Sequence, residues 1–220
     1  MLVGVASTAR DEILARIRAV RPTTPVPVPR NYQTTPAAGT PSSERPDGDL
    51  IDLLVDRLID YRATVRRCEP RELPEALADL LGEVPTVVVP PGLPAGWLST
   101  YPGRVRWDGD PDPLTVADLD APGVAVVTGC AVAIAQTGTL VLDGAAGQGR
   151  RLLSLVPDQH LCVVRADQVV GGLPEALARL VDPTRPLTMV SGPSATSDIE
   201  LDRVEGVHGP RRLEVLVVTG

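Results

Sequence analysis

The sequence predicts an α/β protein, a three-layer sandwich in which helices cover both faces of a mainly parallel sheet. From residue 72 onward, amphipathic helical patterns alternate with short β-branched runs, which is typical of β-α-β units. The run Val124 to Val127 is apolar at every position, as expected of a strand buried on both faces. Another β-branched run lies between Pro85 and Pro90, and these prolines would end a strand on either side of it.

The first helix is expected over residues 9–20, where Ile13, Leu14 and Ile17 recur at helical spacing. Residues 22–48 are so rich in proline, threonine and serine that we expect an extended arm. This arm is either a solvated spacer or a strip that packs on its own domain or a partner. We therefore divide the chain into a helix with a proline-rich arm, 1–48, and an α/β domain, 49–220.

Within the α/β domain, helices are expected wherever apolar residues recur with a period near 3.6, and strands wherever β-branched runs are short. The helices are expected over residues 49–67, 72–81, 115–119, 173–180 and 197–204. The strands are expected within 85–90 and over 105–107, 124–127, 139–142, 161–165, 187–190 and 213–218.

The charge balance excludes several functions. The chain has 21 basic residues, all of them arginine, and a net charge of −7. Without lysine it has no Walker phosphate-loop lysine and no Schiff base. The negative charge argues against nucleic acid and anionic membranes as partners. Since the N-terminus lacks a basic and apolar signal pattern, we expect a cytoplasmic protein.

Two further patterns predict neither a membrane span nor a metal site. Residues 121–142 are uncharged, but their glycines, threonines and Gln136 favour two buried strands over a membrane span. Cys68, Cys130 and Cys162 are far apart and form no C-x-x-C pair, so no metal or iron–sulfur site is expected in this chain.

Three loops have the composition of an anion site, since parallel α/β sheets collect ligands where loops leave the strands. The first contains Thr137, Gly138 and Thr139. The second, residues 143–151, is rich in glycine and ends at Arg151, whose guanidinium suits a carboxylate or phosphate. The third is residues 191–200. We predict that these loops gather around one pocket for a small anion.

The third loop also has the pattern of a helix start. Ser197 and Glu200 have the spacing of a capping box, and hydroxyl or glycine residues precede them. The candidate anion-binding residues of this loop are Ser191, Gly192, Ser194, Thr196 and Ser197. The alternative is that these hydroxyls only cap the helix and shape the turn.

His208 is the candidate acid–base residue. It lies in a glycine-proline turn with Gly209 and Arg211, directly before the last strand. His160 enters another strand in a similar way. For either histidine a purely structural role is the alternative, since no partner spacing identifies a metal site or a triad.

Four motifs follow one another in the C-terminal half: residues 133–142 (AIAQTGTLVL), 153–160 (LSLVPDQH), 191–200 (SGPSATSDIE) and 206–210 (GVHGP). In this order they resemble the motifs of the LUD-domain family, to which lactate utilization protein C belongs. Weaker similarity continues upstream through residues 60–63 and the proline-rich arm.

The resemblance implies a fold of the NagB/RpiA/CoA-transferase-like type, related to formyltetrahydrofolate cyclo-ligases. It also implies a role in the oxidation of L-lactate to pyruvate beside two iron–sulfur partner proteins, which hold the clusters while this chain binds no cofactor of its own. Gln136 departs from the glutamate expected at that position, so any proton chemistry of that carboxylate is missing here.

Three functions therefore remain open. The first is a subunit without clusters that binds a small carboxylate, with Arg211 as a cationic contact and His208 handling the hydroxyl proton. The second is an autonomous enzyme of the cyclo-ligase type, or one that binds CoA or a nucleotide. The third is a pure interaction module that docks through the proline-rich arm.

Overall fold

The structure is a computed structural model that describes residues 8–20, 27, 29, 31, 47–109, 111–182, 184–196, 204–205 and 209–220. Contacts divide the chain into two units, residues 1–32 and 33–220. In the first unit, α1 (Ala9–Val20) has the predicted bounds and buries none of its residues. Most of the proline-rich arm lies outside the described residues, so the boundary at residue 48 stays a prediction.

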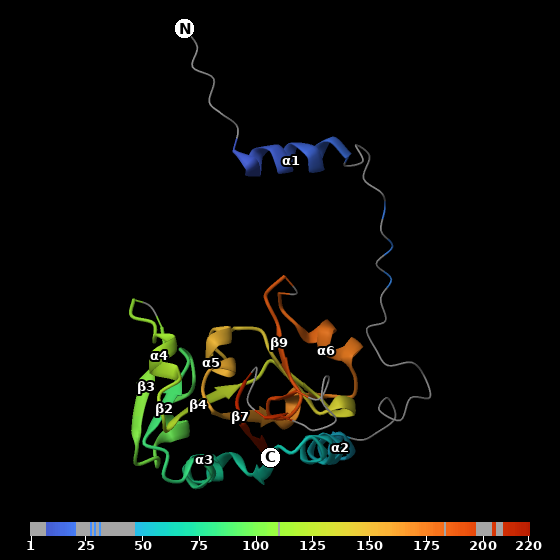
Figure 1. Cartoon of the computed structure of the whole chain (residues 1–220). Coiled ribbons are helices and arrows are strands. Elements are labelled where there is room, and N and C mark those ends of the chain that lie inside the picture. The colour runs from blue at the N-terminus through green and yellow to red at the C-terminus, as the bar shows by residue number, and fades with distance from the viewer. Residues whose placement is uncertain are drawn as a thin grey trace. The chain divides into compact units, whose positions relative to one another are not determined.

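The second unit is built on a six-stranded sheet in which every strand pairs in parallel (Figure 1). Its strand order is β1-β12-β7-β4-β2-β3, so β7 and β4 lie at the centre. The strands are β1 (Thr64–Cys68), β2 (Thr86–Val89), β3 (Arg104–Trp107), β4 (Val124–Gly129), β7 (Gln159–Arg165) and β12 (Arg212–Val218).

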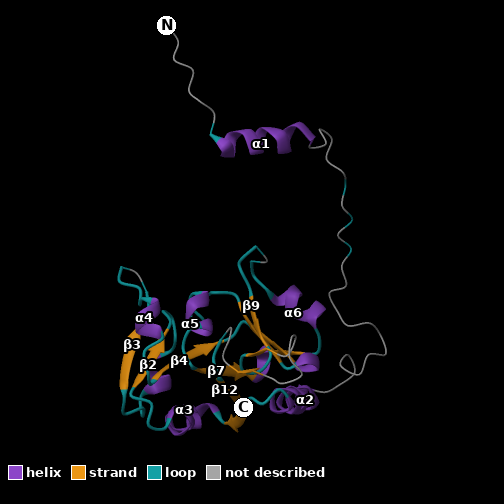
Figure 2. Cartoon of the chain, in the orientation of Figure 1, coloured by secondary structure: helices purple, strands orange, loops and turns teal. Residues whose placement is uncertain are grey.

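Helices cover both faces of this sheet, which confirms the predicted three-layer α/β class (Figure 2). On one face α3 (Leu73–Leu81) packs its buried Leu77 against the sheet. On the other face α2 (Asp47–Asp60) contributes Leu54 and Leu58. The same face also carries α4 (Val116–Leu119) and α5 (Arg151–Leu155).

A second, four-stranded sheet lies between the large sheet and α6 (Leu173–Arg179). One of its faces joins the core that contains α2, and the other packs on α6 through Val132 and Val141. Its strands, in the order β8-β5-β6-β9, are β8 (Val169–Val170), β5 (Val132–Ile134), β6 (Thr139–Leu142) and β9 (Thr188–Val190). The 3-10 turns are η1 (Pro70–Glu72), η2 (Ala95–Leu98), η3 (Ala135–Thr137) and η4 (Ala166–Gln168), and β10 (Ala195–Thr196) pairs with β11 (Val204–Glu205).

One predicted helix differs from the structure, and a second lies almost entirely outside the described residues. The helix expected over residues 49–67 ends at Asp60, because Arg62 takes a left-handed φ of 66° and the β-branched segment that follows pairs with β12 as β1. The helix expected over residues 197–204 lies outside the described residues apart from Val204, which belongs to β11. None of the described helices is both long and apolar enough to cross a membrane.

Candidate functional site

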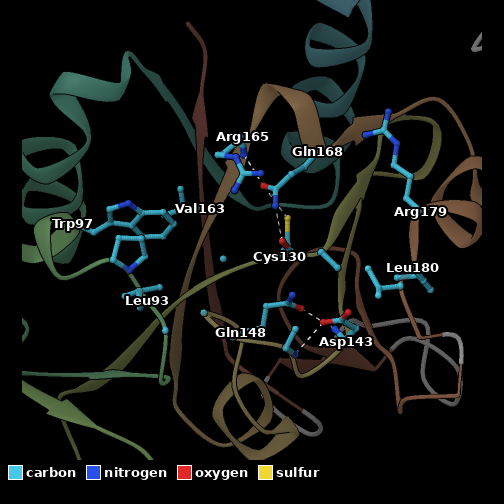
Figure 3. A pocket seen from close by; sticks show the side chains of 18 residues that line it. Leu93, Trp97, Cys130, Asp143, Gln148, Val163, Arg165, Gln168, Arg179 and Leu180 are labelled. Carbon is cyan, nitrogen blue, oxygen red and sulfur yellow. Dashed lines mark hydrogen bonds between the residues drawn. The ribbon is translucent and has the colours of Figure 1, made fainter.

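The candidate site lies where three neighbouring parallel strands end, the edge at which such sheets collect ligands. β2, β4 and β7 lead into segments that surround a cavity of about 370 Å³, which we call the inner cavity (Figure 3). Its lining residues are Gly92, Leu93, Pro94, Trp97, Gly129, Cys130, Ala131, Asp143, Ala145, Ala146, Gly147, Gln148, Val163, Arg165, Gln168, Arg179, Leu180 and Val181.

One side of the inner cavity is apolar. Leu93 and Trp97 follow β2, and Val163 comes from β7 (Figure 3). Gly129, at the end of β4, leaves room beside them: a Cβ there would stand 3.7 Å from the Gly147 carbonyl oxygen and 4.0 Å from the Trp97 ring. A side chain at residue 129 would therefore fit the backbone but occupy the cavity.

Gln168 connects the ends of β4 and β7. Its Nε2 donates to the Cys130 carbonyl oxygen at 2.7 Å, and its Oε1 accepts from the Arg165 main-chain N–H at 2.9 Å. A hydrogen bond with Cys162 and burial raise the pKa of the Cys130 thiol well above its usual range. Cys130 is therefore a neutral thiol, which makes it a poor nucleophile.

Charged groups also line the inner cavity. Asp143 is largely buried, and its carboxylate accepts from the Ala145 N–H at 3.0 Å. Arg165 makes two contacts with the Asp167 carboxylate, at 3.0 and 3.1 Å, which lower the pKa of Asp167. Arg179 donates to the Asp167 carbonyl oxygen at 2.6 Å. The cavity lining thus contains two guanidinium groups and one carboxylate.

The glycine-rich loop, residues 143–149, separates the inner cavity from a second one of about 300 Å³, which we call the outer cavity. Arg150 lines it and forms a two-pronged ion pair with Asp108, at 2.8 Å for both contacts. Burial raises the pKa of Asp108, but hydrogen bonds from Arg150 and the Leu114 N–H outweigh burial and lower it overall. The predicted residue Arg151 also lines this cavity.

The predicted hydroxyl residues meet elsewhere. Thr139 Oγ1 lies 2.7 Å from both Thr137 Oγ1 and Ser191 Oγ. This cluster is at the Thr139 end of β6, whereas Leu142 at the other end lines the outer cavity. Three residues of strand separate the two ends by about 10 Å.

Close packing explains why two positions of these motifs are glycine. Gly138 has φ 60°, and a Cβ there would lie 2.8 Å from the Cβ of Arg57 on α2. Gly192 has φ 83°, and its Cβ would lie 2.6 Å from the Tyr61 carbonyl oxygen. Both turns therefore need glycine in order to pack closely against the end of α2.

The remaining predicted residues are placed only in part. The Ser194 N–H donates to the Pro210 carbonyl oxygen at 2.8 Å, which brings the third loop beside the Gly209 turn. Arg211 lies 3.5 Å from Asp158 at the surface. Ser197, His208 and the side chain of Thr196 lie outside what the structure describes. The described residues of the three loops thus do not enclose a single pocket, and their binding roles stay predictions.

Sequence reasoning missed most of the inner cavity. Trp97 in η2, Arg165 at the end of β7 and Arg179 at the end of α6 are distant in the sequence and carry no local motif. The loop of residues 143–149 was the one signal that pointed there. Within the described residues, no three histidine, cysteine, aspartate or glutamate side chains gather closely enough to hold a metal ion.

Fold and site define an α/β protein with a ligand-sized cavity at the carboxyl edge of a parallel sheet. A family model for the LUD domain matches residues 124–218. Lactate utilization protein C of Deinococcus radiodurans is 53% identical over 173 residues, or 77% of this chain and 80% of that protein. The chain therefore belongs to the LUD-domain family, together with lactate utilization protein C.

Other relatives agree with this membership. Lactate utilization protein C of Shouchella clausii is 24% identical over 203 residues, which cover 86% of each chain. The crystal structure of a DUF162 family protein from Deinococcus radiodurans matches with a TM-score of 0.69 and 44% identity, covering 80% of this chain and 99% of that one. The expected assignment to the NagB/RpiA/CoA-transferase-like type stays a prediction.

Proposed function

We propose that this chain acts in lactate utilization as the component without iron–sulfur clusters, and that it binds a small carboxylate in the inner cavity. The role is supported by the 53% identity to a protein named lactate utilization protein C. In this proposal two iron–sulfur partner proteins hold the clusters that accept electrons, and this chain binds and orients the acid.

The composition of the inner cavity supports carboxylate binding most directly. The described lining holds two arginines and one aspartate, and Arg165 is already paired with Asp167. Arg179 is therefore the cationic group for a bound carboxylate. Leu93 and Trp97 offer an apolar wall for a methyl group, and the Asp143 carboxylate is an acceptor for a hydroxyl.

The volume sets a limit on the ligand. Lactate has six non-hydrogen atoms, and at the liquid-water share of about 30 Å³ for each such atom it takes about 180 Å³. The inner cavity of about 370 Å³ is roughly twice that size. It therefore accommodates a three-carbon acid with several waters, or a larger carboxylate.

Calorimetric titration with L-lactate and pyruvate tests the site. Gly129→Val adds a side chain inside the cavity at a strand position that favours β-branched residues, so we expect it to weaken binding at least about tenfold. Gly96→Ala is the matched control, because a Cβ there meets nothing within 4 Å. Equal affinity of the wild type and Gly129→Val would place the acid elsewhere.

The hydroxyl cluster is the second candidate position for the same ligand. Thr139→Val removes the central hydroxyl between Thr137 and Ser191 and keeps the shape of the side chain. His208→Ala and Arg211→Ala test the sequence-based assignment. If these three variants weaken lactate binding while Gly129→Val does not, the acid binds at the cluster and the inner cavity has another use.

The partner proposal needs a separate experiment. Native protein purified from its source under anaerobic conditions should carry two cluster-bearing proteins with it, detected as iron and acid-labile sulfide. Removal of residues 22–48 tests whether the proline-rich arm contributes to that association. Thermal stabilisation of the isolated chain by ATP, folate or CoA, without iron-bearing partners, would favour the autonomous enzyme instead.

A further inference from the structure

We propose that the outer cavity binds a phosphate dianion, either free phosphate or the terminal group of an organic phosphate. This cavity lies on the other side of the glycine-rich loop from the inner cavity, and its arginines are different ones. The proposal therefore does not depend on carboxylate binding in the inner cavity.

The charges that line the outer cavity favour an anion. Among the described residues that line it, the arginines are Arg150, Arg151 and Arg185, and Asp143 is the one carboxylate. Arg150 is already neutralised by its ion pair with Asp108. Counting that pair as zero, the lining keeps one net positive charge, although the whole chain carries −7.

The inner cavity differs in this respect. There Arg165 pairs with Asp167 at 3.0 Å, which leaves Arg179 opposed by Asp143 and a net charge of zero. The lining of the outer cavity is therefore more positive than that of the inner cavity, and it favours the more highly charged anion.

The geometry of the outer cavity is suited to recognising oxygen atoms. Arg150 is held in place by Asp108 and by the Leu114 carbonyl oxygen, to which it also donates. Two hydroxyl residues, Ser154 and Thr188, line the cavity and are only 3% and 8% exposed, and the Ser154 hydroxyl donates to the Arg151 carbonyl oxygen at 3.1 Å. Guanidinium groups and hydroxyls together are the usual partners of phosphate oxygens.

Size and the number of oxygen atoms distinguish phosphate from a monocarboxylate. The five non-hydrogen atoms of phosphate take about 150 Å³ at about 30 Å³ each, half of the outer cavity of about 300 Å³. A phosphate group offers three or more acceptor oxygens to the guanidinium groups of Arg151 and Arg185 and to the two hydroxyls. A carboxylate offers only two oxygens.

The test is calorimetric titration of the full chain with inorganic phosphate and, in a second arm, adenosine monophosphate, at constant ionic strength. We expect saturable binding that Arg151→Ala/Arg185→Ala weakens at least about tenfold. For the single variant Arg151→Ala, Arg104→Ala is the charge-matched control, since Arg104 begins β3, is exposed and does not line the outer cavity. Melting curves confirm that each variant is folded.

The two arms separate the possible sources of the phosphate group. Tighter binding of the nucleotide indicates an organic phosphate, and equal binding indicates free phosphate. Absence of saturable binding in both arms would overturn the proposal, as would equal weakening by Arg104→Ala, which would indicate an unspecific charge effect. Weaker phosphate binding by Gly129→Val, with unchanged binding by Arg151→Ala/Arg185→Ala, would also overturn it, because phosphate would then occupy the inner cavity.

Discussion

His160 provides a pH test of the core. It lies in β7 with no exposed surface, and its Nε2 is 2.8 Å from Thr128 Oγ1. Its Nδ1 has no hydrogen-bond partner in the described part of the chain. Burial disfavours the charged imidazolium and lowers the pKa of His160 from 6.5 to about 4.

The direction of the effect follows from the lowered pKa. Above pH 6.5 His160 is neutral in both the folded and the unfolded chain, so the full stability is present. Between pH 6.5 and about 4 the unfolded chain binds the proton more readily, so the free energy of unfolding decreases as the pH is lowered. With these two pKa values, the loss between pH 7 and pH 5 is about 2 kcal/mol.

Urea unfolding of wild type and His160→Gln at pH 7 and pH 5 measures this loss. Carboxylates contribute the same pH dependence to both proteins, so the difference between the two pH-dependent losses isolates His160. His208→Gln is the matched control, because the chain has two histidines. We expect His160→Gln to lose about 2 kcal/mol less than wild type on acidification. An identical loss in the two proteins would refute the burial argument.

The other predictions test the structure that holds the site. Asp108→Ala leaves Arg150 without its carboxylate and should lower the free energy of unfolding, measured by urea titration, by about 2 to 4 kcal/mol. Arg106→Ala breaks the more exposed pair with Asp118 and should lower it by less than about 1 kcal/mol. Gly138→Ala should cost about 2 to 4 kcal/mol by thermal melting, from its left-handed φ and its clash with α2, and an effect as small as that of Gly96→Ala would contradict the packing. Because burial and its thiol neighbour keep Cys130 neutral, we expect iodoacetamide to label it at least about 100-fold more slowly in native than in urea-unfolded protein, as read by peptide mass spectrometry.

The buried strands were predictable because parallel strands covered on both faces are apolar along their whole length, as in β4. β1 was not predictable in this way, because its sequence TVRRC continues the helical pattern before it. It forms a strand by pairing with β12, about 150 residues later in the chain. β5 and β8 were missed because strands of two or three residues are too short to show an alternation of apolar and polar side chains.

The site was predictable only where one loop contained it. The loop of residues 143–151 was identified from composition, and its glycine-rich part lines both cavities. The motif glycines Gly138 and Gly192 were predicted as ligand-binding positions, and their close contacts with α2 and with Tyr61 just after it give a packing reason for both. Sequence composition does not distinguish a glycine that admits a ligand from one that admits a neighbouring helix, because both need the missing Cβ.

The glycine-rich loop also determines how the two cavities influence each other. The Gly129 N–H donates to the Gly147 carbonyl oxygen, and the Gly147 N–H donates to the Pro91 carbonyl oxygen, both at 2.8 Å. These bonds fix the loop to the ends of β4 and β2, so the wall between the cavities is anchored by main chain rather than by side chains. Substitutions that line only one cavity, such as those at Arg151 or Arg179, are therefore expected to act additively on the two binding energies. Strong non-additivity would mean that the loop itself shifts between two positions when either cavity is filled.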